Sequence, residues 1–241
     1  MGKLAVAAAV GLASFSAMQA ANASLVIDIR ATTLNGVPVS DPNVVTAGAG
    51  DVIGIQIIGR ATGTNALNDE AFQGVHGSLQ SIGNILGDLG NSFVTDPFTG
   101  NGSQGGSAFD FDADGDLDIG STPTTAAGTN FWIARSAAST TAGAPVAGAD
   151  PASETFVLGG ATFTLKAGAT GESFIDFLVR KAPTGANNLA YGTWTEDNGG
   201  KNAVTGVITS DGLTVRVPEP TGLALAGLAT LGLLARRRNN A

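Results

Sequence analysis

The chain has no cysteine and only one histidine, His76, among its 241 residues. Without cysteine there can be no disulfide, thiolate metal site or cysteine nucleophile. A single histidine makes a histidine-rich metal centre or a histidine-based catalytic triad very hard to assemble. Charged residues are 13% and aromatic residues 6% of the chain, which is unlike a coiled coil or a highly charged disordered protein. Most familiar enzyme chemistry therefore lacks its residues here.

Glycine and acidic residues dominate what is present. The 35 glycines have no three-residue period, which excludes collagen. Residues 24–216 hold 19 Asp and Glu against 8 Lys and Arg, a net charge of −11. Nucleic acids and anionic lipids are disfavoured as partners, because binding either of them needs a basic surface. Cations are favoured.

The N-terminus has the three parts of a secretory signal peptide. Met1-Gly2-Lys3 precedes an apolar stretch over residues 4–17, and small residues occupy Ala21 and Ala23. An apolar stretch of about 14 residues is short of the roughly 20 that span a bilayer. We expect residues 1–23 to be a signal peptide cleaved before Ser24, which exports the rest of the chain.

The C-terminus carries a second transport pattern. Pro218-Glu219-Pro220 precedes residues 221–235, which have no charge, and Arg236, Arg237 and Arg238 follow. Fifteen helical residues reach about 22 Å, against about 30 Å of hydrocarbon. The segment therefore suits a transient membrane helix better than a permanent one. The arginines would keep the end of the chain on the cytoplasmic side, which leaves residues 24–216 outside.

These C-terminal parts resemble the PEP-CTERM sorting signal of bacterial exported proteins, over about 25 residues at 217–241. The same segment is also named the ice-binding protein C-terminal domain, a label that says nothing about binding ice. The resemblance implies processing by an exosortase-type membrane protease and delivery to the cell surface or its exopolysaccharide. Glu219 would then belong to a motif that another enzyme reads, together with Pro218, Pro220 and the arginines at 236–238.

Between the two ends, apolar residues recur with a period of two, which is typical of half-buried strands. The clearest alternations cover residues 25–30, 53–58, 162–166, 175–180 and 213–217, and weaker ones cover 72–82, 130–135, 156–158, 191–195 and 204–209. Turn residues separate them, as at Asn35-Gly36 and Asp211-Gly212. We expect residues 24–216 to form a single all-β domain, a β-sandwich or jelly roll.

Two stretches with few apolar residues are expected to be long surface connections, over residues 84–108 and 136–153. The sequence Ala49-Gly50-Asp51-Val52 at the start of a strand resembles the corresponding part of cohesin-like sandwiches. This short resemblance implies only the sandwich, and no binding residue follows from it.

The one chemically distinctive motif lies at residues 110–121. Asp110, Asp112, Asp114 and Asp118 stand at positions 1, 3, 5 and 9 of a twelve-residue calcium loop, with Gly115 at position 6. A chain that wraps a calcium ion turns every second side chain inward and needs a sharp turn near the middle. We expect Asp110, Asp112 and Asp114 to bind directly, Asp116 through its carbonyl, and Asp118 directly or through water.

The motif departs from an EF-hand or dockerin loop at its end, because position 12 is Ser121 instead of a bidentate acid. No helix pattern flanks it either. The absence of the bidentate ligand predicts one weak calcium site, with a dissociation constant of about 10⁻⁴ to 10⁻³ M. A solvated acidic loop without an ion is the alternative. Where calcium does bind, stiffening a long loop is the expected role.

The sequence thus favours an exported structural or adhesive protein without catalytic activity, contacting exopolysaccharide. The alternative is a secreted carbohydrate-binding or carbohydrate-active protein that uses Asp and Glu. An open cleft with two facing acids, for which Glu154, Glu172 and Asp176 are candidates, would favour an enzyme. A flat face with exposed aromatics would favour sugar binding; the candidates are Trp132, Tyr191 and Trp194.

Overall fold

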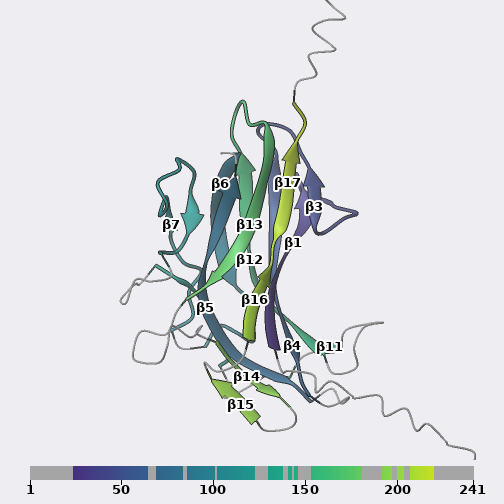
Figure 1. The fold of residues 1–241 in the computed structure, drawn as a ribbon, viewed down its shortest axis with the longest axis vertical. Helices are drawn as coiled ribbons and strands as arrows, with labels where there is room; N and C mark the ends of the chain where they lie inside the picture. The colour runs from purple at the N-terminus through teal and green to yellow at the C-terminus, as the bar shows by residue number, and fades with distance from the viewer. Residues whose placement is uncertain are drawn as a thin grey trace, which may run out of the picture.

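The computed structural model describes residues 24–64, 69–83, 86–100, 102–122, 130–137, 141–142, 144–145, 153–180, 192–196, 200–203 and 207–219. Every regular element in these residues is a β-strand, and the strands form two sheets (Figure 1). The prediction of an all-β sandwich is therefore confirmed. The signal peptide at 1–23 and the apolar segment with the arginines at 221–238 lie outside the described residues.

The first sheet, sheet A, has seven strands in the order β11-β12-β4-β1-β16, with β2 beside β1 and β6 beside β12. Its strands are β1 (Ser24–Leu34), β2 (Val37–Pro38), β4 (Val52–Thr62), β6 (Gly87–Val94), β11 (Ala144–Pro145), β12 (Ser153–Leu165) and β16 (Val207–Asp211). The long strands β1, β4 and β12 pair antiparallel. β1 and β4 hold the isoleucine-rich alternations that the sequence predicted.

The second sheet, sheet B, has ten strands in the order β15-β14-β5-β13-β17-β3, with β8, β9 and β10 also pairing with β5, and β7 with β8. Its strands are β3 (Val44–Thr46), β5 (Ala71–Gly83), β7 (Ala108–Phe109), β8 (Asp118–Ile119), β9 (Trp132–Arg135), β10 (Thr141–Ala142), β13 (Gly171–Val179), β14 (Gly192–Glu196), β15 (Gly200–Ala203) and β17 (Leu213–Val217). Most of them flank the long strand β5.

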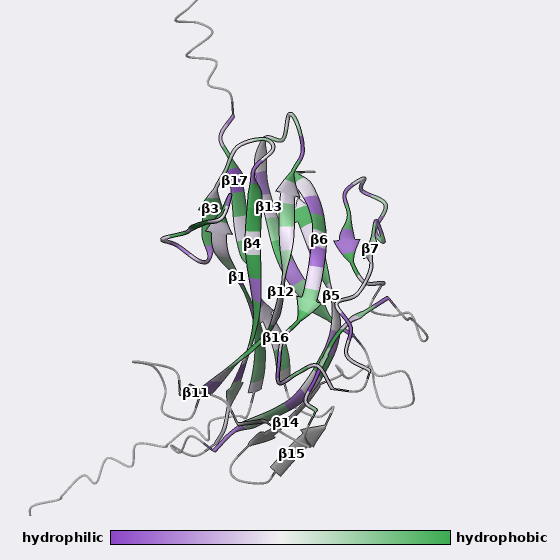
Figure 2. Ribbon diagram, turned by 180° about the vertical axis from the view of Figure 1, so that it is seen from behind, coloured by the Kyte–Doolittle hydropathy of each residue, from purple (hydrophilic) through white to green (hydrophobic). Residues whose placement is uncertain are grey.

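One hydrophobic core joins the two sheets. Sheet A contributes Ile27 from β1 and Phe163 from β12, and sheet B contributes Phe177 from β13 and Val215 from β17, all fully or almost fully buried. The ring of Phe177 meets Trp132 edge-on, with 5.8 Å between the ring centroids. Apolar residues alternate with polar ones along the strands (Figure 2), so each sheet buries one face.

A tight hairpin at Asn35-Gly36 joins β1 to β2, as the sequence predicted. Both residues have positive φ, 51° and 79°, the conformation that a two-residue hairpin requires and that Asn-Gly adopts readily. The Asn35 side chain donates to Asp51 Oδ1 at 2.7 Å, and the Asp51 side chain also accepts from the Gly48 N–H. These bonds lower the pKa of Asp51 and fix the start of β4.

The predicted surface loop over residues 84–108 is wrong in its first half. Residues 87–94 form β6, which pairs antiparallel with β12. The sequence did not indicate this strand because it has few apolar residues. It lies at an edge of sheet A and buries only Gly87 and Leu89. Backbone pairing with β12, the buried Leu89 side chain and the hydrogen bond from Asn91 to Thr162 hold it there. In the other predicted connection, residues 141–142 and 144–145 form the short strands β10 and β11.

Asp211-Gly212 is a crossing between the sheets and not a hairpin turn. β16 pairs in parallel with β1 in sheet A, and β17 pairs antiparallel with β13 in sheet B. A Cβ on Gly212 would collide with the Phe174 ring and lie 2.6 Å from the Ile175 carbonyl oxygen. The glycine therefore permits a close approach where the chain changes sheet.

The two ends of the described chain lie at opposite ends of the sandwich (Figure 1). β1 begins at Ser24, the residue after the predicted cleavage point, and pairs from this residue onward with β4 and β16. β17 ends at Val217, directly before the Pro-Glu-Pro motif. In the part of the chain that the structure covers, no helix is long and apolar enough to cross a membrane.

Candidate metal centre

The acidic loop lies between β7 and β8, beside the C-terminal half of β5. Phe109 and Asp118 pair across β7 and β8, and Ile119 pairs with Leu79 of β5. The loop is thus closed at its base by strand pairing and fastened to sheet B on one side. The motif lies between strands, as its lack of helical flanks predicted.

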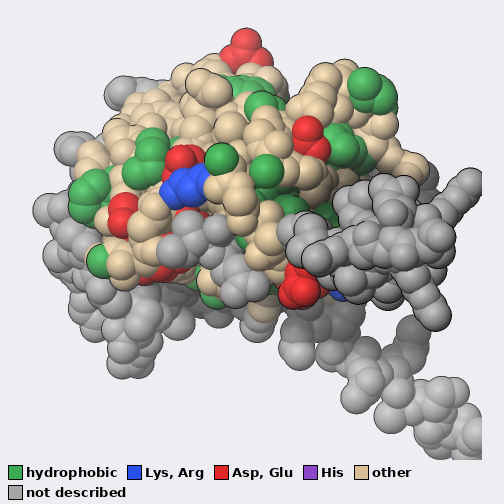
Figure 3. Space-filling model, turned by 90° about the horizontal axis from the view of Figure 1, so that it is seen from above, with side chains coloured by type: hydrophobic (Ala, Val, Ile, Leu, Met, Phe, Trp, Pro, Cys, Tyr) green, Lys and Arg blue, Asp and Glu red, His purple; other side chains and the backbone are tan. Residues whose placement is uncertain are grey.

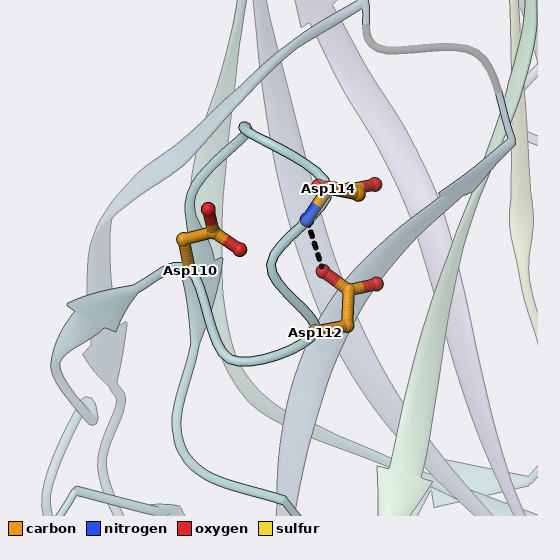
Figure 4. Close-up of side chains that lie close together, drawn as sticks. All are labelled: Asp110, Asp112 and Asp114. Atoms are coloured by element: carbon orange, nitrogen blue, oxygen red, sulfur yellow. Dashed lines mark hydrogen bonds between the residues drawn. The ribbon is translucent and has the colours of Figure 1, made fainter.

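The loop makes the sharp turn that the motif requires. Gly115 has a φ of 99°, and Ala113 also lies in the left-handed region with a φ of 64°. The Asp110 side chain accepts from the Gly115 N–H at 3.2 Å, and Asp114 accepts from the Asp116 N–H at 3.1 Å. Asp110 extends across the loop toward the arm that carries Asp112 and Asp114 (Figure 4). The turn therefore brings these three carboxylates close to one another.

The five predicted aspartates form two groups of three. In the outer group, Asp110, Asp112 and Asp114 have ligand oxygens within 4.8 Å of one another, and in the inner group Asp112, Asp116 and Asp118 do so. A calcium ion holds its oxygens at about 2.3–2.6 Å, so two ligands on opposite sides of one ion are about 5 Å apart. The oxygens of each group are therefore spaced as the ligands of one calcium ion would be.

Asp116 and Asp118 are both buried, and only Asp116 departs from the expectation for its position. Their side chains are 1% and 0% exposed, whereas the motif predicted that Asp116 would use its carbonyl. Both face Ser81 of β5, whose hydroxyl donates to Asp116 Oδ2 and whose N–H donates to Asp118 Oδ1 at 2.9 Å. Because β8 pairs with β5, these two carboxylates point into the protein and lie between the loop and β5.

Three carboxylate oxygens at this site are buried without a hydrogen-bond partner: Asp110 Oδ1, Asp116 Oδ1 and Asp118 Oδ2. Burial, together with the neighbouring aspartates, raises the pKa of both Asp116 and Asp118 to about 7. At an effective dielectric constant of about 20, two charged carboxylates about 4.8 Å apart repel by about 3.5 kcal/mol. A bound divalent cation removes both costs, because it supplies the missing partner and the missing charge.

Residues far away in the sequence complete the surroundings. Gln80 of β5 donates from Nε2 to Asp112 Oδ2 at 2.7 Å. Asp88 of β6 accepts from the Leu117 N–H at 2.9 Å and pairs with Lys166 at 2.9 Å, and Lys166 also donates to the Gly115 carbonyl at 2.6 Å. The motif did not identify these residues, since no local pattern brings β5, β6 and the end of β12 to one place.

The end of the loop is held by serine instead of a bidentate acid. The Ser78 hydroxyl donates to the Ser121 carbonyl at 2.7 Å and accepts from the Ser121 N–H at 3.1 Å. Gly120, with a φ of 120°, lies against Ser78 and leaves no room for a Cβ. Position 12 is thus fixed to β5 through its backbone.

Acidic side chains outnumber basic ones on the face of the sandwich at the upper end of Figure 1 (Figure 3).

The other candidate residues do not form a sugar site or a catalytic cleft in the described residues. Trp132 and Trp194 are fully buried in the core, and Tyr191 lies outside the described residues. Glu154 is buried on β12, whereas Glu172 is exposed on β13 and pairs with Arg216 at 2.6 Å. Asp176 is also on β13 and accepts from the Phe177 N–H. Glu154 thus belongs to a different sheet from Glu172 and Asp176.

A polar hollow of about 430 Å³ does contain two acids, Asp28 and Asp211, at the edge where β16 leaves sheet A. Asp28 pairs with Arg30 at 2.5 Å, and Asp211 pairs with Arg60 at 3.1 Å. Both carboxylates are therefore neutralised, which does not suit the acid and nucleophile of a glycosidase.

In the sorting motif, Pro218 and Glu219 are exposed, and Pro220 and Arg236 to Arg238 lie outside the described residues.

Comparison with known proteins gives structural neighbours only. No protein-family model and no curated protein matches the chain. The seventh ScaB type I cohesin from Pseudobacteroides cellulosolvens matches with a TM-score of 0.39 and 10% identity, over 83% of this chain and 94% of the cohesin. The third ScaC cohesin of Acetivibrio cellulolyticus, solved with the ScaB dockerin, matches with a TM-score of 0.32 and 12% identity, over 81% and 99%. The assignment of the sandwich rests on the strand pairing above.

Proposed function

We propose that this protein is an exported, non-enzymatic module of the cell surface or extracellular matrix, in which calcium bound by the acidic loop stiffens the sandwich. One observation carries the proposal: three carboxylate oxygens in the loop are buried without a partner. Buried polar groups in proteins are almost always satisfied, and without an ion these three oxygens have no partner.

Calcium would act here as a structural fastener. Asp116 and Asp118 are already bonded to Ser81 of β5, and Lys166 at the end of β12 is bonded to the loop and to β6. Calcium held by the loop aspartates would strengthen a loop that is bonded to β5 of sheet B and, through Lys166 and Asp88, to β12 and β6 of sheet A. Stiffening of a surface loop suits an extracellular module, since calcium outside cells reaches millimolar levels that a weak site can use.

The export part of the proposal rests on the two ends of the sequence. The described fold begins at Ser24, directly after the proposed signal peptide, and its last strand ends at Val217, directly before the Pro-Glu-Pro motif. Pro218 and Glu219 are exposed, which leaves them accessible to an exosortase-type protease. The protein would then contact the membrane only through its C-terminal segment. The β-sandwich would contact the exopolysaccharide outside the cell.

A carbohydrate-active enzyme is not favoured by the described residues. The acids on β12 and β13 do not share a cleft, and those in the polar hollow are ion-paired. That hollow also contains Asn43 and Phe174, which is 39% exposed. Paired arginine and aspartate side chains next to an aromatic ring can bind sugar hydroxyls, so this is where we expect exopolysaccharide to make contact.

Two measurements test the proposal. Isothermal titration of the exported protein with calcium should give saturable binding that Asp112→Ala with Asp114→Ala abolishes, and magnesium at the same concentration should bind more weakly. The absence of heat up to several millimolar calcium would contradict the calcium role. Mass spectrometry of the surface form should find it without residues 236–238, and recovery of the intact tail would contradict the sorting role.

A further inference from the structure

The buried half of the acidic cluster is an unusual environment for carboxylates. Asp116 and Asp118 are at most 1% exposed, and each has one oxygen bonded to Ser81 and one without a partner. The outer group needs neither of them, because Asp110, Asp112 and Asp114 already have the span of a shell. The outer group therefore does not account for these two buried carboxylates, although the motif predicts Asp118 as a ligand of the same ion.

The geometry assigns to this inner group, Asp112, Asp116 and Asp118, a second cation position, distinct from the one that the outer group forms. This inference rests on the proposed calcium binding and deepens it. Asp112 belongs to both groups, whereas no group contains both Asp110 and Asp118. The acidic loop is therefore a two-calcium site bridged by Asp112, with one ion in the turn and one between the loop and β5.

The donor set at the inner position suits calcium. Three carboxylates have oxygens within 4.8 Å of one another, and the Ser81 hydroxyl is bonded to one of them, Asp116. Calcium takes six to eight hard oxygen ligands and accepts carboxylates in one- or two-oxygen coordination, so the partnerless oxygens Asp116 Oδ1 and Asp118 Oδ2 are natural ligands. No nitrogen or sulfur ligand is present in either group, which argues against zinc or copper.

The charge of the cluster also fits two ions better than one. The five loop aspartates and Asp88 carry six negative charges when ionised, and Lys166 is paired with Asp88. One calcium ion would leave a net charge of −3 around two buried carboxylates, and two calcium ions would leave −1. Bridging carboxylates make such close pairs of ions possible, because each ion neutralises part of the same charge.

The stoichiometry of calcium binding tests this directly. We expect equilibrium dialysis of the exported protein against millimolar calcium, followed by metal analysis, to give two ions per chain. Asp110→Asn with Asp114→Asn should remove one ion, Asp116→Asn with Asp118→Asn should remove the other, and Asp112→Asn should weaken both. Asp211→Asn is the matched control, because this aspartate is exposed and pairs with Arg60 away from the loop, and it should keep both ions.

A single ion in the unchanged protein, lost in both double variants, would overturn the second position and leave the proposed calcium role intact. No bound ion at all would overturn both. The outer variant keeps the result decisive even if the inner variant does not fold, since Asp110 and Asp114 are not deeply buried: one ion retained there supports the inner position, and none retained contradicts it.

Discussion

The main-chain N–H of Ser81 in β5 donates to Asp118 Oδ1 at 2.9 Å, which ties the acidic loop to the long inner strand of sheet B. Ser81 lies 37 residues before Asp118, so the bond exists only because β8 pairs with β5 at Leu79 and Ile119. The calcium loop is therefore coupled to the central strand of sheet B. Events in the loop should accordingly change the stability of the whole sandwich.

The Ser81 hydroxyl should matter most when calcium is absent. In Ser81→Ala, Asp116 loses a buried donor, and we expect a loss of about 1–2 kcal/mol in the free energy of unfolding measured with chelator. Saturating calcium should recover part of this lost stability, because the ion then neutralises the charge of the Asp116 carboxylate. Ser173→Ala is the control: this buried serine donates to the Ile82 carbonyl at 3.1 Å and not to a loop aspartate, and its effect should not depend on calcium.

The calcium-free protein should lose stability as the pH rises. Burial raises the pKa of Asp116 and Asp118 to about 7 from an ordinary value of 3.8. Their protonated forms stabilise the fold fully below about pH 4, and this contribution is lost as the pH rises through about 7, at a cost of at most roughly 4 kcal/mol for each carboxyl. Urea unfolding between pH 5 and pH 8 in chelator measures it.

The same experiment on Asp116→Asn with Asp118→Asn isolates these two groups, since asparagine cannot ionise. The difference between the two proteins should grow with pH in chelator and shrink when calcium is added. A difference that is independent of pH would show that neither carboxyl has a raised pKa.

His76 should act in the opposite direction. This half-buried residue of β5 has its pKa lowered to about 4, mainly by burial and also by Arg180 and Arg135. The neutral form stabilises the fold above pH 6.5, and that contribution is lost as the pH falls toward 4, by up to about 2 kcal/mol after allowance for its partial exposure. In His76→Gln the stability should change less between pH 7 and pH 4.5, and an unchanged pH profile would refute this.

The crossing between the sheets should be sensitive at Gly212. We expect Gly212→Ala to destabilise the protein by about 1–3 kcal/mol, because the new methyl group meets the Phe174 ring and the Ile175 carbonyl. Gly90→Ala on β6 is the control, since a Cβ there has only Thr162 Oγ1, at 4.0 Å, within reach. Thermal unfolding of both variants checks this, and equal effects would mean that the crossing is not tightly packed.

The sequence predicted the strands that bury alternating apolar residues, such as β1 and β4, because the two faces of a half-buried strand differ in polarity. It could not predict β6, whose edge position demands few apolar residues. It could not predict the parallel pairing of β1 with β16 either, since strand partners distant in sequence leave no local pattern. Asp211-Gly212 separates two strands, as predicted, but the sequence could not show that these strands belong to different sheets.

For the site, the sequence identified all five aspartates but not their division into two groups. Spacing along the chain describes how a loop wraps an ion, so Asp110, Asp112 and Asp114 were placed as the structure has them. The inward direction of Asp116 and Asp118 depends on β5, as do the contacts of Gln80 and Ser81. Those contacts exist only in the folded sheet.

The most direct test of the calcium role is the melting temperature of the exported protein, measured in chelator and in calcium from micromolar to millimolar concentration. Binding to the folded state alone raises stability by about 2.7 kcal/mol when free calcium is about 100 times the dissociation constant. We predict a saturable rise in melting temperature that is absent in Asp112→Ala with Asp114→Ala. An identical melting temperature at all calcium concentrations would contradict the account.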